Sequence, residues 1–238
     1  MSGKDLRRPI NLEQLEYLKN SMIEQIYRRA KYLIFALDND LVIIMHLGMS
    51  GRILIDDSHM PDKHKHFTLY TNRMKLDFYD PRRFGLITIC AKSMVPDFGM
   101  EPLTEEYSAQ YMQKICANSR RNIKTLLLSG AAVVGIGNIY VCEILFAAKI
   151  SPFRIANNLS QDEISALVAC SKTILLQAIQ NRGTSFRDYV DIDGEKGEFF
   201  SLCKVYGRKN EPCRRCASNI LYTQIAGRGS FYCPICQN

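Results

Sequence analysis

The chain of 238 residues is 47% hydrophobic and 23% charged, and its 31 lysines and arginines exceed its 24 aspartates and glutamates, giving a net charge of +7. This is the composition of a globular protein and excludes a disordered chain, while the basic excess favours nucleic acid or another anionic surface as a partner. A chain of this length has room for more than one core, and we expect two domains followed by a small C-terminal module.

The protein is expected to be cytoplasmic. Its N-terminus lacks the apolar core of a signal peptide, and its most apolar longer run, residues 126–141, is interrupted by glycines and polar residues. Five of the nine cysteines are dispersed along the chain and do not form a disulfide framework, which indicates a reducing compartment.

Residues 1–98 are predicted to form a mostly β domain. Asn11 followed by Gln14 is typical of a capping box, so a short amphipathic helix should begin there. Between residues 23 and 89, short segments rich in Ile, Val, Leu, Phe and Tyr alternate with turn residues. Segments of that length and spacing predict an antiparallel β-sandwich.

Three motifs in this domain carry more polar or flexible residues than a fold requires. Arg28-Arg29-Ala30-Lys31 is either a solvated strand face or a strand that faces phosphate. In residues 46–51 a methionine, Met49, stands between two glycines, and we expect it to be exposed. Lys63-His64-Lys65-His66 alternates like a strand and lacks the spacing and the acidic companions of a metal site.

The fourth motif is Asp80-Pro-Arg-Arg-Phe-Gly85, a turn with two arginines and an aromatic residue. It has two interpretations. A guanidinium and a ring held on a turn are the groups that insert into a base stack. The alternative is an ordinary Asp-Pro turn with a buried Phe84.

Residues 99–202 are predicted to be helical. Thr104 should cap a helix that runs towards Ala117, and Ser119 should open another with Arg120 and Lys124 in its first turn. Cations at that end oppose the helix dipole, which is reasonable only if an anion docks there.

Residues 133–140 contain a Gly-x-Gly turn that lacks the third glycine of a dinucleotide site, and we expect Asn138 to cap the following helix with amides free to bind phosphate. Ser160 and Glu163 form a capping box for a long helix to about Asn181. Residues 191–200 hold two glycines among charged and aromatic residues, which is typical of a mobile loop that acts as a lid.

Residues 203–238 are predicted to form a zinc ribbon. Two Cys-x2-Cys pairs, separated by sixteen residues, supply four thiolates: Cys213, Cys216, Cys233 and Cys236. Since all four positions are protein ligands, the zinc ion should be structural, and its binding should supply the folding free energy of so short a segment. Five cations lie within residues 208–228, with Arg228 between two glycines at an expected hairpin tip, which is typical of a module that binds a polyanion.

The chain resembles the formamidopyrimidine-DNA glycosylases from about Leu6 to its last residue. The motifs that carry the resemblance are collinear and specific: RRAKYL (28–33), HLGMSG (46–51), KHKH (63–66), DPRRFG (80–85), VVGIGNIY (133–140) with Glu143, VYGRKNEPCRRC (205–216) and FYCPICQ (231–237). The resemblance implies a β-sandwich, a helix-two-turn-helix domain and a zinc ribbon. It also implies a monomeric base-excision-repair glycosylase and AP lyase that flips oxidised purines, such as 8-oxoguanine and formamidopyrimidines, out of double-stranded DNA.

The resemblance also implies roles for single residues. Lys31 corresponds to the essential cleft lysine of the family. The residues that fill the gap left by the flipped base correspond to Met49, Arg82 and Phe84. Contacts to the DNA backbone correspond to His64, Arg120 and Lys124.

Two further sets follow from the resemblance. Asn138 and Arg228 correspond to the pair that clamps the phosphates at the lesion, and Arg228 also assists the second elimination. The loop that covers the extruded base corresponds to Lys196, Gly197, Glu198 and Phe199.

One family feature has no counterpart among these residues. The family nucleophile is the secondary amine of an N-terminal proline followed by a catalytic glutamate, whereas this sequence begins Met-Ser-Gly-Lys. Attack on the sugar needs an amine that is unprotonated at neutral pH, which a terminal amine provides better than an ordinary lysine. A sandwich without its first strand should also expose a sheet edge and apolar surface and be less soluble than an extended version.

Four interpretations remain open. The translation start lies further upstream and the protein is an ordinary glycosylase; or the chain binds lesions or abasic sites without catalysis; or Lys31, beside Arg28 and Arg29, forms the Schiff base itself. A zinc-ribbon protein of transcription or RNA handling would explain the ribbon and the charge, but not DPRRFG or VVGIGNIY.

Overall fold

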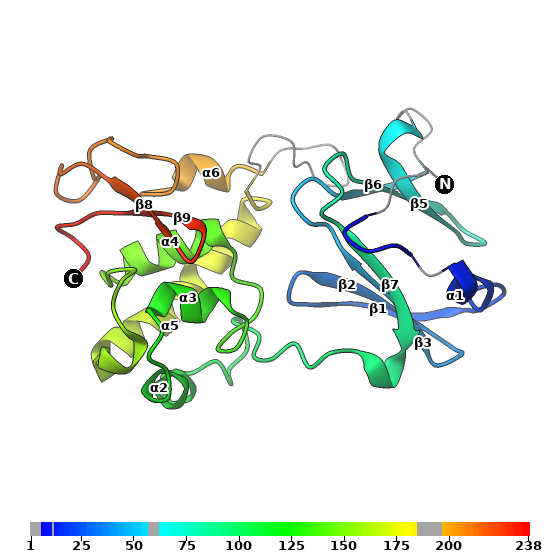
Figure 1. The fold of residues 1–238 in the computed structure, drawn as a ribbon, viewed down its shortest axis with the longest axis horizontal. Coiled ribbons are helices and arrows are strands. Elements are labelled where there is room, and N and C mark those ends of the chain that lie inside the picture. The colour runs from blue at the N-terminus through cyan, green and yellow to red at the C-terminus, as the bar shows by residue number, and fades with distance from the viewer. Residues whose placement is uncertain (1–5, 11, 57–61, 185–196) are drawn as a thin grey trace. The chain divides into compact units, whose positions relative to one another are not determined.

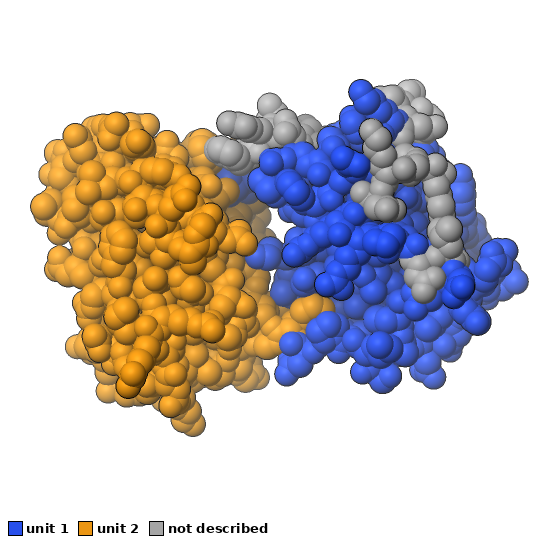
Figure 2. Space-filling view, in the orientation of Figure 1, with its two compact units in different colours: residues 1–97, 184–197 blue, residues 98–183, 198–238 orange. Residues whose placement is uncertain are grey.

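The chain forms two compact units. The computed structural model describes residues 6–10, 12–56, 62–184 and 197–238. Unit 1 comprises residues 1–97 and 184–197, and unit 2 comprises residues 98–183 and 198–238 (Figures 1 and 2). Residues 203–238, predicted as a separate ribbon, therefore lie in the same unit as the helices.

Unit 1 is the predicted antiparallel β-sandwich. After the short helix α1 (Leu12–Glu16), one sheet has the order β1-β2-β3-β7 and the other the order β4-β6-β5 (Figure 1). The first sheet consists of β1 (Ile23–Arg29), β2 (Tyr32–Leu37), β3 (Leu41–His46) and β7 (Leu86–Ala91). The second consists of β4 (Arg52–Ile55), β5 (Lys65–Tyr70) and β6 (Lys75–Tyr79).

The core of unit 1 lies between these two sheets. Phe35 of β2 pairs with Ile43 of β3, and both side chains are almost completely buried together with Ile87 of β7. Phe67 and Phe78 contribute the facing surface from the second sheet. Burial of each such side chain stabilises the sandwich by roughly 1.5–3 kcal/mol.

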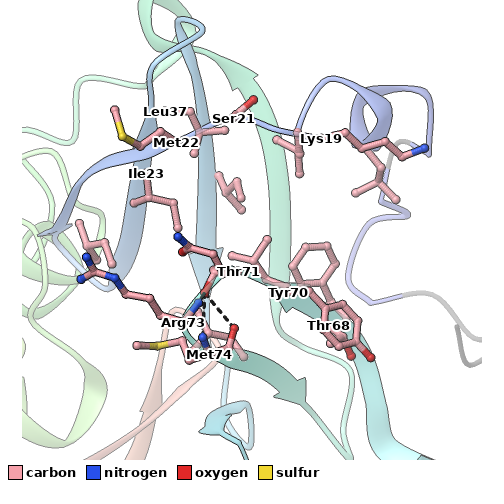
Figure 3. Close-up of a pocket in the computed structure, with 18 of the residues that line it drawn as sticks. Lys19, Ser21, Met22, Ile23, Leu37, Thr68, Tyr70, Thr71, Arg73 and Met74 are labelled. Atoms are coloured by element: carbon pink, nitrogen blue, oxygen red, sulfur yellow. Dashed lines mark hydrogen bonds between the residues drawn. The ribbon is translucent and has the colours of Figure 1, made fainter.

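A groove of about 1620 Å³ opens beside the two edge strands β1 and β5 (Figure 3). Segments from Leu15 to Ile26 and from Lys65 to Met74 line most of it. Apolar side chains remain exposed around this groove, with Ile26 at 55% and Tyr70 at 75% of their surface. The groove therefore borders an edge strand of each sheet and carries exposed apolar surface within the described part of the chain.

Unit 2 is helical, with a β-hairpin at its C-terminal end. Its helices are α2 (Ala109–Ala117), α3 (Ile123–Leu128), α4 (Asn138–Ala147), α5 (Gln161–Gln180) and α6 (Phe199–Leu202). The hairpin consists of β8 (Leu221–Ile225) and β9 (Arg228–Tyr232), which pair antiparallel. Apolar residues of all these parts except α6 share one continuous core.

The capping box of α5 is confirmed, because Ser160 accepts from the Glu163 amide and Glu163 accepts from the Ser160 amide. Three predicted starts in unit 2 differ. Ser108 caps α2, since the Thr104 hydroxyl instead donates to the Glu101 carbonyl. Asn122 caps α3 by accepting from the Thr125 amide.

The third difference is at α4, where Gly137 is the N-cap and Asn138 is the first helical residue. The side-chain amide of Asn138 donates to the Gly229 carbonyl in the hairpin, so it serves a tertiary contact and not the cap. Across the described residues, no helix is long and apolar enough to cross a membrane.

Candidate nucleic-acid interface

Two neighbouring turns in unit 1 present an exposed methionine beside an arginine and a phenylalanine. Met49 is 59% exposed and Phe84 is 47% exposed. The Arg82 guanidinium lies 5.2 Å from the centre of the Phe84 ring. The interpretation of DPRRFG as a turn with a buried phenylalanine is therefore wrong, and the cation and ring form a stacked pair on the surface.

Buried polar groups hold these turns. Asp80 is fully buried and accepts hydrogen bonds from the Ser50 hydroxyl at 2.5 Å and from the Gly85 amide at 2.6 Å. The Arg82 amide donates to the Ser50 hydroxyl at 3.2 Å, so one carboxylate ties together the turns that carry Met49 and Phe84.

Close backbone approach makes the spacing of the two turns strict. Gly48 adopts a φ of +67°, and a Cβ there would lie 2.6 Å from the Phe84 carbonyl carbon. No other residue fits this position without moving the Phe84 turn. Gly48 is thus explained by the contact between the two motifs, whereas a Cβ at Gly51 would lie 2.1 Å from the Leu47 carbonyl oxygen of its own motif.

Cationic groups gather near the same turns. Lys31 is exposed in the turn between β1 and β2, where Ala30 adopts a φ of +52°. Burial and the nearby charges of Lys31 and Arg7 lower the pKa of His46, whose Nδ1 accepts from the Gly48 amide at 2.9 Å. The neutral form of His46 therefore supports the turn that carries Met49.

The KHKH motif is only partly a strand. Lys63 and His64 lie in a 3-10 turn, and β5 begins at Lys65. His66 is buried, with its Nε2 2.9 Å from the Asp80 carbonyl oxygen. Of the two histidines, His64 is half-buried and is the one left for contacts outside the domain.

In unit 2 the hairpin turn brings Arg228 close to the start of α4. Ala226 and Gly227 form the two-residue turn with φ values of +48° and +71°, and the exposed Arg228 opens β9 directly after it. Asn138 donates to the Gly229 carbonyl at 3.0 Å. Since Gly229 directly follows Arg228, this hydrogen bond links the two expected clamp residues.

The two other cations expected at this surface differ in exposure. Arg120 is exposed and precedes α3. Lys124 has 0% of its surface exposed, and its ammonium donates to the Gly229 carbonyl and the Ser230 hydroxyl. The expectation of a direct Lys124 contact to the DNA backbone is corrected, because these bonds keep the ammonium inside the fold.

One residue of the expected capping loop, Lys196, lies outside the described residues. Gly197 is buried and Glu198 is exposed. Phe199 is 2% exposed, with its ring 5.4 Å from the Tyr140 ring in a small core cluster. Phe199 therefore packs in the fold, and the expectation that it covers a flipped base is corrected.

The four cysteines of the ribbon meet as predicted. Their sulfur atoms all lie within 4.8 Å of one another, with 3.9 Å between Cys213 and Cys236 and 3.5 Å between Cys216 and Cys233. A tetrahedral zinc ion with bonds of about 2.3 Å requires sulfur separations of about 3.8 Å. The donor set therefore fits a metal ion with four thiolate ligands.

Not all the cations of the ribbon face outward. The Arg215 guanidinium donates to the Phe146 carbonyl at 2.7 Å and lies 4.2 Å from the Phe146 ring, which covers the last turn of α4. Arg208 donates to the carbonyls of Lys204 and Pro212. Arg215 therefore ties the ribbon to α4, whereas these bonds of Arg208 stay within residues 203–238.

Models of known protein families match most of the chain. Residues 1–87 match the family model described as the formamidopyrimidine-DNA glycosylase N-terminal domain, and residues 98–190 match the H2TH domain of the same enzymes. The formamidopyrimidine-DNA glycosylase of Wolbachia pipientis wMel is 40% identical over 240 residues, which cover 98% of this chain and 89% of that protein. This chain belongs to the formamidopyrimidine-DNA glycosylase family.

Solved structures of the family have the same fold. The MutM (Fpg) protein of Thermus thermophilus matches with a TM-score of 0.86 and 33% identity over 96% of this chain and 86% of that one. The Lactococcus lactis Fpg in complex with DNA containing an abasic site matches with a TM-score of 0.85 and 34% identity over 96% of this chain and 87% of that one. The three-part architecture and the family resemblance predicted from the motifs are confirmed.

Two supports of this glycosylase fold were missed from the sequence. Asp80 and Ser50 hold the exposed turns, a role that the sequence did not reveal although both residues lie in motifs that it singled out. Glu143, 2% exposed, accepts from the amides of Lys204, Val205 and Tyr206 at 2.7–3.0 Å and so anchors the start of the ribbon. An acidic residue inside an apolar helix, as in NIYVCEILFA, is the signal that could have revealed this anchor.

Proposed function

We propose that this glycosylase binds duplex DNA at oxidised or abasic sites and fills the gap left by the extruded base with Met49, Arg82 and Phe84. The observation that carries this proposal is the exposure of Met49 and Phe84 on turns fixed by the buried Asp80. Apolar wedges of this kind partly replace the stacking that a flipped base gives up. Oxidised purines, 8-oxoguanine and formamidopyrimidines among them, are the proposed lesions.

Phosphate binding is assigned to the second unit and to Lys31 and His64. Arg228 and Asn138 are proposed to hold the phosphates at the lesion, with Arg120 on the flanking backbone. Arg228 is also proposed to assist the second elimination. Arg228 is exposed beside a turn, where its planar guanidinium can bind two phosphate oxygens.

The cysteine cluster is proposed to hold one structural zinc ion. Zinc is the metal that four thiolates in tetrahedral array favour, and with no ligand position left for water it would supply stability to the hairpin and no chemistry. Atomic emission of the purified protein should give one zinc per chain. A value near zero for the folded protein would exclude this assignment.

The test of binding compares a duplex with a tetrahydrofuran abasic analogue and the matched intact duplex. We expect a preference for the analogue that falls on Phe84→Ala and Met49→Ala. Tyr70→Ala is the control, because Tyr70 is an exposed aromatic residue, at 75%, on the edge strand β5 of the same unit. Equal binding of both duplexes by the parent chain would contradict the proposal.

The amine nucleophile is tested separately by borohydride reduction of the 238-residue chain on abasic DNA. Absence of a trapped adduct would exclude Lys31 as the amine that attacks the abasic sugar. An adduct that disappears in Lys31→Ala would assign the nucleophile to this lysine. An adduct that survives the substitution would assign it to another amine of the chain.

A further inference from the structure

Lys124 is a completely buried lysine, and its ammonium donates hydrogen bonds within unit 2. It donates to the Gly229 carbonyl at 2.8 Å and to the Ser230 hydroxyl at 2.5 Å. Removing an ammonium from water costs several kcal/mol unless strong hydrogen bonds compensate. A methionine would fill the same volume without that cost, so the charge needs a reason beyond packing.

Both acceptors belong to the hairpin residues that follow Arg228. The Ser230 hydroxyl, which accepts from Lys124, donates in turn to the Arg228 carbonyl at 3.2 Å. The Gly229 carbonyl also accepts from Asn138 at 3.0 Å. The ammonium therefore joins α3, the first residue of α4 and the backbone of Arg228 in one hydrogen-bonded junction.

The charge of this junction is not neutralised by its acceptors, since a carbonyl and a hydroxyl are both uncharged. Burial lowers the pKa of Lys124, the neighbouring Cys142 side chain raises it, and the charge of Arg228 lowers it. A phosphate beside Arg228 would relieve that repulsion and would be attracted by both cations at low local dielectric.

We propose that Lys124 is a positioning residue, which holds the backbone of Arg228 in register with Asn138 so that both can grip one phosphate group. This inference rests on the proposed function of Arg228 and Asn138. It replaces a direct contact of Lys124 with DNA by an action through the hairpin. Its consequence is that the effect of Lys124 on binding exists only while Arg228 is present.

A double-mutant cycle measures that dependence on the tetrahydrofuran duplex. Lys124→Met should weaken binding about tenfold, or 1.4 kcal/mol. In an Arg228→Ala background the same change should weaken binding less than about twofold, or 0.4 kcal/mol. Ser230→Ala removes one acceptor of the ammonium and should show the same dependence on Arg228.

Lys172→Met is the matched control, because the Lys172 ammonium also donates to a backbone carbonyl, that of Thr104, at 2.8 Å in the same unit. It should leave binding within about twofold. Zinc content and far-ultraviolet circular dichroism establish that each variant is folded, and Ser230→Ala decides the question if Lys124→Met does not fold.

Equal losses in the presence and absence of Arg228 would overturn the inference, as would unchanged binding by folded Lys124→Met. A different result would show that the proposed function itself is wrong. In that case Arg228→Ala alone would leave the preference for the abasic analogue unchanged, and the positioning role of Lys124 would be rejected as well.

Discussion

The buried carboxylate of Asp80 gives the sharpest test of how the wedge residues are held. Asp80→Asn keeps the size of the side chain but replaces one acceptor oxygen with an NH2 group. In the parent chain the Ser50 hydroxyl and the Gly85 amide donate to the two carboxylate oxygens at 2.5 and 2.6 Å. In the variant the NH2 group faces one of these two donors. The Gly85 amide is a donor only, so at least one of the two contacts is weakened or lost.

The magnitude follows from these contacts. A hydrogen bond to a charged group contributes about 1.5–3 kcal/mol, and the remaining bond becomes a neutral one. We expect unit 1 to lose about 2 kcal/mol of stability, which lowers the midpoint of a transition of this size by roughly 10 °C. Because Ser50 also accepts from the Arg82 amide, the turn that presents Arg82 and Phe84 should loosen.

The assay combines thermal unfolding with the ratio of affinities for abasic-analogue and intact duplexes. Asp77→Asn is the control, since Asp77 is equally buried, accepts from the Thr68 hydroxyl at 2.6 Å and pairs with Lys75 at 2.7 Å within the second sheet. It should lower stability by a similar amount and leave the affinity ratio unchanged. An unchanged ratio in Asp80→Asn, or an equal fall in both variants, would refute the reasoning.

Three further outcomes are expected. Glu143→Gln should lower the stability of unit 2 by about 2 kcal/mol in denaturant unfolding, because one of three buried amides loses its acceptor. A zinc chelator should abolish the preference for the abasic analogue and unfold the hairpin by circular dichroism, whereas retained binding would contradict a structural metal. Because the pKa of His46 is lowered in the folded protein, the unfolded chain binds a proton at this residue before the folded chain does as the pH falls below 6.5. The stability that His46 contributes above that pH is therefore lost as the pH falls towards the folded pKa. His46→Asn should flatten this dependence, and an identical pH profile would contradict it.

Local patterns in the sequence predict much of the fold and the positions of the motifs. The capping box at Ser160 and the paired cysteines depend on residues close in sequence, and both are found as predicted. The exposure of Met49 was also predictable, because glycines on both sides restrict the turn. In each case the determinant lies within a few residues.

Side-chain directions were not predictable where a distant segment decides them. Lys124 is buried by a hairpin that is distant in sequence, since Ser230 follows it by 106 residues. Phe199 is buried against Tyr140, and the exposed Arg215 is held by the carbonyl of Phe146. A cation in a sequence is expected on the surface, and only the tertiary fold supplies the acceptors that allow its burial.

The two candidate contact surfaces are built on one physical plan. In unit 1 the exposed Arg82 and Phe84 stand beside the buried acceptor Asp80. In unit 2 the exposed Arg228 stands beside the buried donor Lys124. Each buried charge faces backbone groups of the turn, so it fixes the turn without occupying the exposed surface. The groups proposed to touch DNA and the groups that hold them in place are therefore separate residues, and substitutions of the two kinds should differ in their effect on stability.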